Sequence, residues 1–371
     1  MLKKFKVANF KCFKDEFVFD LSSVRDYDFN TECIKNGIVN NSIIYGYNGS
    51  GKSNLGWAIF DIVEHLTDNN RQEFPYKHYS NAYNESKIVK FEYDFLFEST
   101  KVTYCYSKFD YKRILSESLY INDTEVISFD RENGNTTFIS RLEGTETLNK
   151  TIADASLSVL RYIKNNSVLK DNTENKAFKN FFHFVEHMLF FRSLEDRTYI
   201  GQSSGTVTLT DEIIRENKVG DFETFLNEAN IECTLSVVND GIGNKNIAFN
   251  FGKTKIPLID IMSTGTSSLM LFYYWHLYIQ REVSFVFIDE FDAFYHHELS
   301  RLVIKKLKQS GVQFVITTHN TSVMSNDLMR PDCLYMMNNR KILSLPQCTE
   351  KELREEHNIE KIYKANGFHV K

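Results

Sequence analysis

Residues that break secondary structure are scarce in this sequence of 371 residues, which has only 4 prolines and 16 glycines. It is instead rich in aromatic residues, with 31 Phe and 19 Tyr, and this composition excludes a disordered chain. No apolar run is long enough to span a bilayer, since the richest one, residues 269–279, is short and contains His276. The amino terminus lacks the continuous apolar segment of a signal peptide. We therefore expect a cytoplasmic globular protein without a membrane partner.

Cysteine pairs are also missing, because the 6 cysteines are scattered with no CxxC motif and no spacing typical of metal ligands. Reduced thiols are the simplest interpretation, so we expect neither zinc nor disulfide bonds. The formal net charge of −5 gives no overall attraction to nucleic acid, although a local basic patch would still be able to bind it. Composition alone therefore leaves nucleic acid open as a partner.

The hydrophobic pattern divides the chain into three regions. In residues 1–147 it predicts two alternating strands around a turn, then an apolar strand at residues 43–45 followed by a helix from about Ser53. Short alternating segments between residues 88 and 139 predict an antiparallel sheet. Residues 148–230 show helical spacing, and we interpret them as an insertion. The clearest helical segments are residues 153–163, 178–191 and 221–230.

Residues 231–371 form the third region. Strand-like segments come first, followed by a loop at residues 263–268 and a helix. Two near-continuous apolar strands, residues 285–289 and 314–317, then appear with a helix between them. Such strands are typical of a parallel sheet that is buried on both faces.

The loop at residues 46–53, GYNGSGKS, matches the phosphate-binding pattern GxxxxGK[ST] at every position. It lies between an apolar strand and a helix, which is the context of a phosphate-binding loop. The alternative is a chance glycine-rich turn, which would not need these flanking elements. Backbone N–H groups of such a loop surround the β-phosphate of a nucleotide, Lys52 reaches the β and γ oxygens, and the Ser53 hydroxyl binds Mg²⁺. The residues that we assign to ATP here are Gly46, Asn48, Gly49, Ser50, Gly51, Lys52, Ser53 and Asn54.

Two further strands end in residues suited to phosphate chemistry. Residues 285–290, FVFIDE, end in two carboxylates, of which we expect Asp289 to hold Mg²⁺ and Glu290 to polarise the attacking water. The next strand delivers His319 to the carboxyl edge of the sheet, where we expect it to contact the γ-phosphate and orient the water. The alternatives are an acidic strand end that serves solubility and a structural histidine.

In this order the motifs resemble those of the ABC/SMC-like P-loop ATPases. Within them the chain is most similar to stand-alone prokaryotic ATPases related to the amino-terminal domain of OLD-family nucleases and to abortive-infection ATPase subunits. The resemblance covers both ends of the chain and is faint in the middle. It implies an ABC-type α/β fold with a mixed or parallel central sheet, an antiparallel β subdomain and a helical insertion.

Residues 262–266, MSTGT, occupy the place of the family's signature loop, with Ser263 and Gly265 on its serine and second glycine. In the family these two residues touch the γ-phosphate bound by the other subunit. The resemblance therefore implies a homodimer, or a higher homo-oligomer, that assembles through ATP. Thr264 and Thr266 depart from the transporter form of the motif, and a Ser/Thr-rich helix cap is the alternative.

Several other positions gain a role only from the resemblance. Asp292 matches the aspartate that communicates across the dimer, and His296 falls where this branch often has a histidine. Lys11 sits where SMC-like relatives carry a basic residue near the nucleotide, or it is a solvated lysine on a strand. Gln72 is the only candidate for the glutamine that joins the Mg²⁺ site to the insertion.

The resemblance implies an ATPase that uses ATP and Mg²⁺, and we expect a switch in a prokaryotic anti-phage defence system. OLD nucleases continue into a nuclease domain, whereas this chain ends about fifty residues after His319, so we expect a separate effector protein, a nuclease or a toxin. An SMC-like DNA-repair or DNA-binding ATPase is the alternative, although residues 148–230 are too short and too aromatic for a long coiled coil. A transporter subunit is disfavoured by the altered signature.

Overall fold

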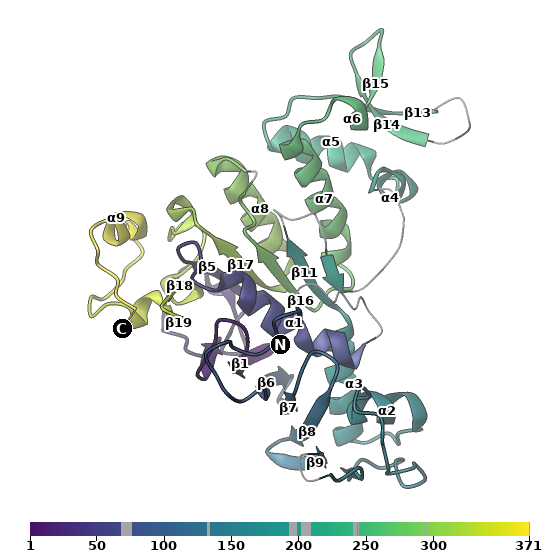
Figure 1. Cartoon of the computed structure of the whole chain (residues 1–371). Helices are drawn as coiled ribbons and strands as arrows, with labels where there is room; N and C mark the ends of the chain where they lie inside the picture. Colours follow the sequence, from purple (N-terminus) through teal and green to yellow (C-terminus); the bar gives the residue numbers. More distant parts are fainter. Residues whose placement is uncertain are drawn as a thin grey trace.

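The computed structural model describes residues 1–67, 76–131, 134–192, 199–201, 209–239, 243, 245–293 and 295–370. Its central feature is a seven-stranded sheet in the order β12-β11-β16-β17-β5-β18-β19 (Figure 1). The inner strands from β11 to β18 run parallel, and β12 and β19 are antiparallel to their neighbours. The predicted α/β class with a mixed central sheet is therefore confirmed. The strands are β5 (Asn41–Tyr45), β11 (Met188–Arg192), β12 (Tyr199–Gly201), β16 (Phe285–Asp289), β17 (Gln313–Thr318), β18 (Leu334–Asn338) and β19 (Lys341–Ser344).

A second seven-stranded sheet is antiparallel throughout, as the alternating pattern predicted, and has the order β10-β9-β8-β7-β6-β1-β2. Most of its strands alternate buried and more exposed side chains, because one face packs on the core. Its strands are β1 (Leu2–Ala8), β2 (Phe17–Asp20), β6 (Val89–Phe97), β7 (Thr100–Lys108), β8 (Ile114–Ile121), β9 (Thr124–Asp130) and β10 (Ile139–Ser140). A short hairpin of β3 (Ile34–Lys35) and β4 (Ile38–Val39) stands apart.

Helix α1 (Lys52–Leu66) lies between the two sheets, which explains why almost all of its residues are buried. On one side Gly56 allows close approach, since a Cβ there would lie 2.8 Å from ring atoms of Phe190 in β11 and Phe287 in β16. On the other side the Tyr93 hydroxyl of β6 donates to the Ala58 carbonyl oxygen at 2.9 Å. The position of α1 is thus fixed from both faces.

The region of residues 148–230 is not helical throughout. Helix α2 (Val159–Asn166) covers only the second half of the helix expected over residues 153–163, because residues 153–158 form no helix. Helix α3 (Thr173–Glu186) begins before the helix expected over residues 178–191 and ends at Glu186. Met188–Arg192 instead form β11, which pairs in parallel with β16 in the central sheet. The prediction was wrong there because an apolar run of this length suits a buried strand as well as a buried helix.

The chain then forms a small lobe at the opposite end of the core from β8 and β9 (Figure 1). It contains a three-stranded sheet and short helices, and its chain leads directly into the long helix α7 (Thr264–Ile279). The loop expected at residues 263–268 was wrong, because α7 begins at Thr264. The elements of the lobe are α4 (Leu209–Arg215), α5 (Val219–Glu228), β13 (Leu235–Asn239), β14 (Lys245–Asn250), β15 (Lys255–Pro257) and α6 (Leu258–Ile261).

Two more helices complete the fold. Helix α8 (His297–Ser310) connects β16 to β17, as the parallel arrangement of these strands requires. Helix α9 (Ile359–Lys364) lies near the carboxyl terminus, where the Tyr363 hydroxyl is hydrogen-bonded to those of Tyr45 and Tyr47. Within the described ranges, none of the helices has both the length and the apolar character needed to cross a bilayer.

Candidate nucleotide site

The loop between β5 and α1 has the backbone conformation that a phosphate-binding loop requires. Gly49 and Gly51 have φ values of 77° and 108°, which favour glycine because they lie in the left-handed region. Gly46 is required for a different reason, since a Cβ there would lie only 2.7 Å from the Met337 carbonyl oxygen of β18 and from Ser50 Oγ. The loop therefore lies tightly against the neighbouring strand.

Lys52 lies at the centre of this loop and is only 4% exposed. Its Nζ donates to the carbonyl oxygens of Gly46 at 2.8 Å and Tyr47 at 3.2 Å, and lies 3.2 Å from Nε2 of His319. Burial lowers the pKa of Lys52, although the nearby carboxylates, Asp289 first among them, act in the opposite direction. The ammonium thus faces a site with several acidic groups.

Other residues of the loop leave polar groups available for a ligand. Ser50 Oγ is buried and has no hydrogen-bond partner among the described residues, a costly state that an anionic ligand would relieve. Asn48 is exposed and lines the open side of the loop together with Gly49. Ser53 and Asn54 lie in the first turn of α1. This environment fits the phosphates of a nucleoside triphosphate.

The carboxyl end of β16 places the two acidic residues beside the loop. The Thr317 hydroxyl of β17 donates to Asp289 Oδ1 at 2.7 Å and accepts from the Glu290 amide at 2.8 Å. Glu290 has a φ of 48°, a left-handed conformation that costs free energy in a residue other than glycine. Its Oε1 lies 3.3 Å from Nε2 of His319. Glu290 is therefore directed toward His319 by a strained backbone that Thr317 supports.

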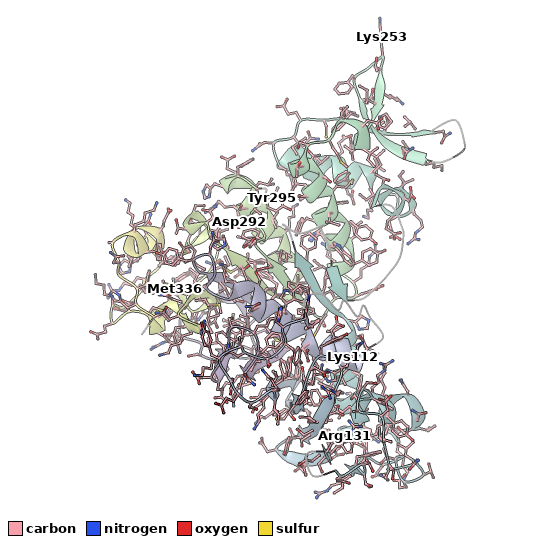
Figure 2. The ribbon with its side chains drawn as sticks, in the orientation of Figure 1. Lys112, Arg131, Lys253, Asp292, Tyr295 and Met336 are labelled. Atoms are coloured by element: carbon pink, nitrogen blue, oxygen red, sulfur yellow. The ribbon has the colours of Figure 1, made fainter. Side chains whose placement is uncertain are left out.

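Asp292 lies just beyond this point, next to Tyr295 (Figure 2). The Thr318 hydroxyl donates to Asp292 Oδ2 at 2.6 Å, and burial raises the pKa of Asp292 although this hydrogen bond acts against the rise. No role was predicted for Thr317 and Thr318 from the sequence. The available signal was the pair of hydroxyl residues directly before His319, at the strand end that meets the acidic loop.

An open pocket of about 670 Å³ lies where these elements meet. The phosphate-binding loop, the end of β16 and the end of β17 each contribute to its wall. It is lined by Asn48, Gly49, Glu290, Asp292, Ala293, His319 and Asn320. The predicted residues from three distant parts of the sequence are thus brought together at one edge of the sheet, as expected for an open α/β sheet.

The remaining candidates do not reach this pocket within one chain. Ser263 is the N-cap of α7, where its Oγ accepts from the Thr266 amide at 3.1 Å, and Gly265 follows in the first turn. Figure 1 shows this end of α7 beside α6, away from the start of α1. His296 is exposed at the start of α8. Gln72 lies outside the described residues.

Lys11 lies in a turn and not on a strand, with a φ of 46°. It follows β1 and precedes Cys12, which contacts the end of the phosphate-binding loop, since a Cβ on Gly51 would lie 3.0 Å from the Cys12 sulfur. Burial lowers the pKa of Lys11. The placement of Lys11 on an amphipathic strand was therefore wrong, and the residue is half-buried in a turn.

Comparisons with known proteins agree with the architecture only in outline. The SmcHead bound to the C-winged helix domain of ScpA is 16% identical over 93% of this chain and 98% of that chain, with a TM-score of 0.47. The SMC head domain from Thermotoga maritima is 15% identical over 92% and 98%, with a TM-score of 0.46. Similarities of this extent carry no conclusion about function. No match was found among the curated proteins.

A family model gives the clearest result. It matches residues 42–325, which include the phosphate-binding loop, both carboxylates at the end of β16 and His319. The matched region covers most of the chain and all of the strands that form the pocket. The protein therefore belongs to the family described as "AAA domain, putative AbiEii toxin, Type IV TA system".

Proposed function

We propose that this protein is an ATP-binding and ATP-hydrolysing molecular switch. The observation that carries the proposal is the convergence of Lys52 and Glu290 on His319, with Lys52 Nζ and Glu290 Oε1 within 3.3 Å of the same imidazole at the wall of the pocket. Lys52 supplies positive charge for the β- and γ-phosphates. Glu290 polarises the attacking water, and His319 orients it against the γ-phosphate.

The residues present also suit Mg²⁺. Ser53 and Asp289 are the proposed ligands, because a hydroxyl at the start of α1 and a carboxylate at the end of β16 supply the oxygen atoms that Mg²⁺ prefers. A bound Mg²⁺ would neutralise charge on the β- and γ-phosphates. Thr317 holds Asp289 in place through the hydrogen bond to Oδ1. This arrangement leaves Glu290 for the water.

Replacing Glu290 by Gln tests the assignment. The amide keeps the shape of the side chain and removes the negative charge, so ATP should still bind while hydrolysis falls by about 10²-fold or more. Lys52→Ala is the comparison, and it should abolish binding because the phosphates lose their main counter-charge. We would measure binding of a labelled ATP analogue and phosphate release. Hydrolysis by Glu290→Gln at the parental rate would leave Glu290 only a structural role.

We propose further that the working site is shared between two subunits. Ser263 and Gly265 would face the phosphates held by Lys52 of a second copy, because the amino-terminal end of a 16-residue helix favours anions and, among the described residues, this end of α7 lies away from the start of α1 (Figure 1). Gly265→Arg should then block closure of the dimer and leave ATP binding by the P-loop largely intact.

Mixing two inactive variants distinguishes a site shared between subunits from a site formed within one chain. In a heterodimer of Lys52→Ala and Gly265→Arg chains, one composite site carries both lesions and the other carries neither, so part of the hydrolysis should return. Glu290→Gln should also accumulate as an ATP-stabilised dimer in sedimentation experiments, because blocked turnover traps the closed state. A mass that does not depend on nucleotide in any variant would contradict ATP-driven closure.

The biological role that we propose is the regulatory ATPase of a prokaryotic anti-phage defence system, related to OLD-family ATPases and acting with a separate nuclease or toxin. The family description, which refers to a toxin of a type IV toxin–antitoxin system, supports a role connected with such a system. The DNA-repair alternative calls for a long coiled coil, whereas the longest described helix between α1 and α7 is α3, with 14 residues. Phage challenge of cells carrying this gene and its neighbours tests the role. Protection that survives Lys52→Ala would refute it.

A further inference from the structure

A second pocket lies on the other side of the phosphate-binding loop from Glu290 and His319. Its volume is about 410 Å³, and its walls are the loop itself and the turn between β18 and β19. The strand order β16-β17-β5-β18 places the two pockets on opposite sides of β5 and its loop. The lining residues are Tyr47, Asn48, Gly49, Ser50, Asn338, Asn339 and Arg340.

The turn that forms the far wall carries an arginine where glycine would be favoured. Asn339 and Arg340 are the two central residues and have φ values of 48° and 61°. Two-residue hairpin turns of this kind commonly use Asn-Gly, since a side chain in the left-handed region costs roughly 1 kcal/mol. Retaining Arg340 at this position is a local cost, and such costs concentrate where side chains bind ligands.

The guanidinium of Arg340 is positioned to bind an anion. The residue is exposed, and the described part of the chain gives it no ion-pair partner. Arg340 lines the same pocket as Ser50, and Met337 of the preceding strand lies beside Gly51, since a Cβ there would be 3.1 Å from the Met337 Cε. Arg340 therefore lies on the side of the loop where α1 begins.

The order of the phosphate groups along a nucleotide then indicates which group lies beside Arg340. The γ-phosphate lies on the side of Glu290 and His319, and the β-phosphate lies within the loop around Lys52. The next group must extend past the loop toward β18 and the Arg340 turn. We propose that Arg340 binds the α-phosphate of the nucleotide, an inference that rests on the proposed ATP site. Arg340 would then increase the affinity for the nucleotide and take no part in the hydrolysis step.

Replacing Arg340 by Gln tests this assignment. The Kd values for ATP and ADP should each rise roughly tenfold, as expected for loss of one charge-assisted hydrogen bond in an exposed site, while kcat at saturating ATP stays unchanged. Lys341→Gln is the matched control, because it removes the same charge from the next residue, which does not line the pocket. Equal losses in both variants would indicate only a general electrostatic effect and would overturn the proposal.

Arg340→Gly distinguishes a loss of nucleotide binding from a loss of stability. Glycine relieves the strain of the turn, so its Tm should equal or exceed that of the parent while its affinity for ATP falls as in Arg340→Gln. An unchanged Kd in both variants would overturn the inference and leave the proposed ATPase intact. If the parental protein failed to bind ATP, both the ATPase and the role of Arg340 would be wrong.

Competition with tripolyphosphate identifies the group that Arg340 contacts. This ligand offers three phosphate groups and no ribose or base, so its affinity, obtained from displacement of labelled ATP and corrected for the Kd of ATP in each protein, should be higher for the parental protein than for Arg340→Gln protein. Equal tripolyphosphate affinity in the two proteins, together with weaker ATP binding by Arg340→Gln, would show that the side chain reads the nucleoside and would overturn the α-phosphate assignment.

Discussion

A buried ion pair under α1 offers a direct test of how the P-loop helix is held. Lys108, at the end of β7, donates from Nζ to Asp61 Oδ2 of α1 at 2.7 Å, and neither side chain is exposed. The hydroxyls of Tyr106 and Tyr79 also donate to Asp61, at 2.9 and 2.8 Å. Lys108→Met should lower the free energy of unfolding by about 3–5 kcal/mol, because it removes the ammonium paired with a buried carboxylate and leaves the tyrosine hydroxyls and the His65 imidazole, whose Nδ1 lies 3.9 Å from Oδ2, beside it.

The double variant Asp61→Asn with Lys108→Met supplies the control. Its neutral amide can still accept a hydrogen bond from Tyr79, so we expect it to recover about 2 kcal/mol or more of the loss caused by Lys108→Met alone. Urea unfolding followed by circular dichroism and by tryptophan fluorescence measures this, since Trp57 lies in α1 itself. If the double variant is no more stable than Lys108→Met, the uncompensated charge of Asp61 is not the cause of the loss.

Two further changes test particular contacts. Gly46→Ala should weaken ATP binding at least tenfold and cost about 1–3 kcal/mol of stability, because the new Cβ would lie 2.7 Å from the backbone oxygen of Met337. Gly220→Ala is the control, since Gly220 lies in α5 with open space around it, and this change should be neutral or stabilising in urea unfolding. Equal losses of stability in the two variants would contradict the steric explanation. Burial lowers the pKa of His276 from 6.5 to about 4, so the unfolded chain takes up this proton first, and stability should fall by about 3 kcal/mol as the pH drops from 6.5 toward 4. His276→Gln should remove that part of the pH dependence of the urea midpoint, and an unchanged profile would refute the assignment.

The parts of the fold that the sequence predicted well are those with one dominant pattern. Residues 285–289 and 314–317 are continuous apolar runs, and they form adjacent buried strands of the central sheet. The start of α1 at Lys52 follows from the phosphate-binding motif, which fixes both the loop and the helix after it. Strong local patterns of this kind leave little choice of structure.

Features that depend on distant contacts were not predictable in the same way. β11 is an apolar run whose partner, β16, lies about a hundred residues further on, so only the assembled sheet decides against a helix. The hydrogen bonds of Thr317 and Thr318 depend on where β17 lies beside β16. Arg340 belongs to no sequence motif, and a role in binding can be inferred only because its turn lies beside the phosphate-binding loop.

The pairing of β5 has a consequence for synthesis of the chain. Residues 41–45 pair with residues 314–318 on one side and with residues 334–336 on the other, whereas the strands β6 to β9 pair with neighbours that follow immediately in sequence. On the ribosome the antiparallel sheet can therefore form early, while β5 waits for strands that emerge nearly three hundred residues later. The loop that follows β5 gains its support only then, so a nascent chain should acquire nucleotide binding only after residues 314–336 have emerged.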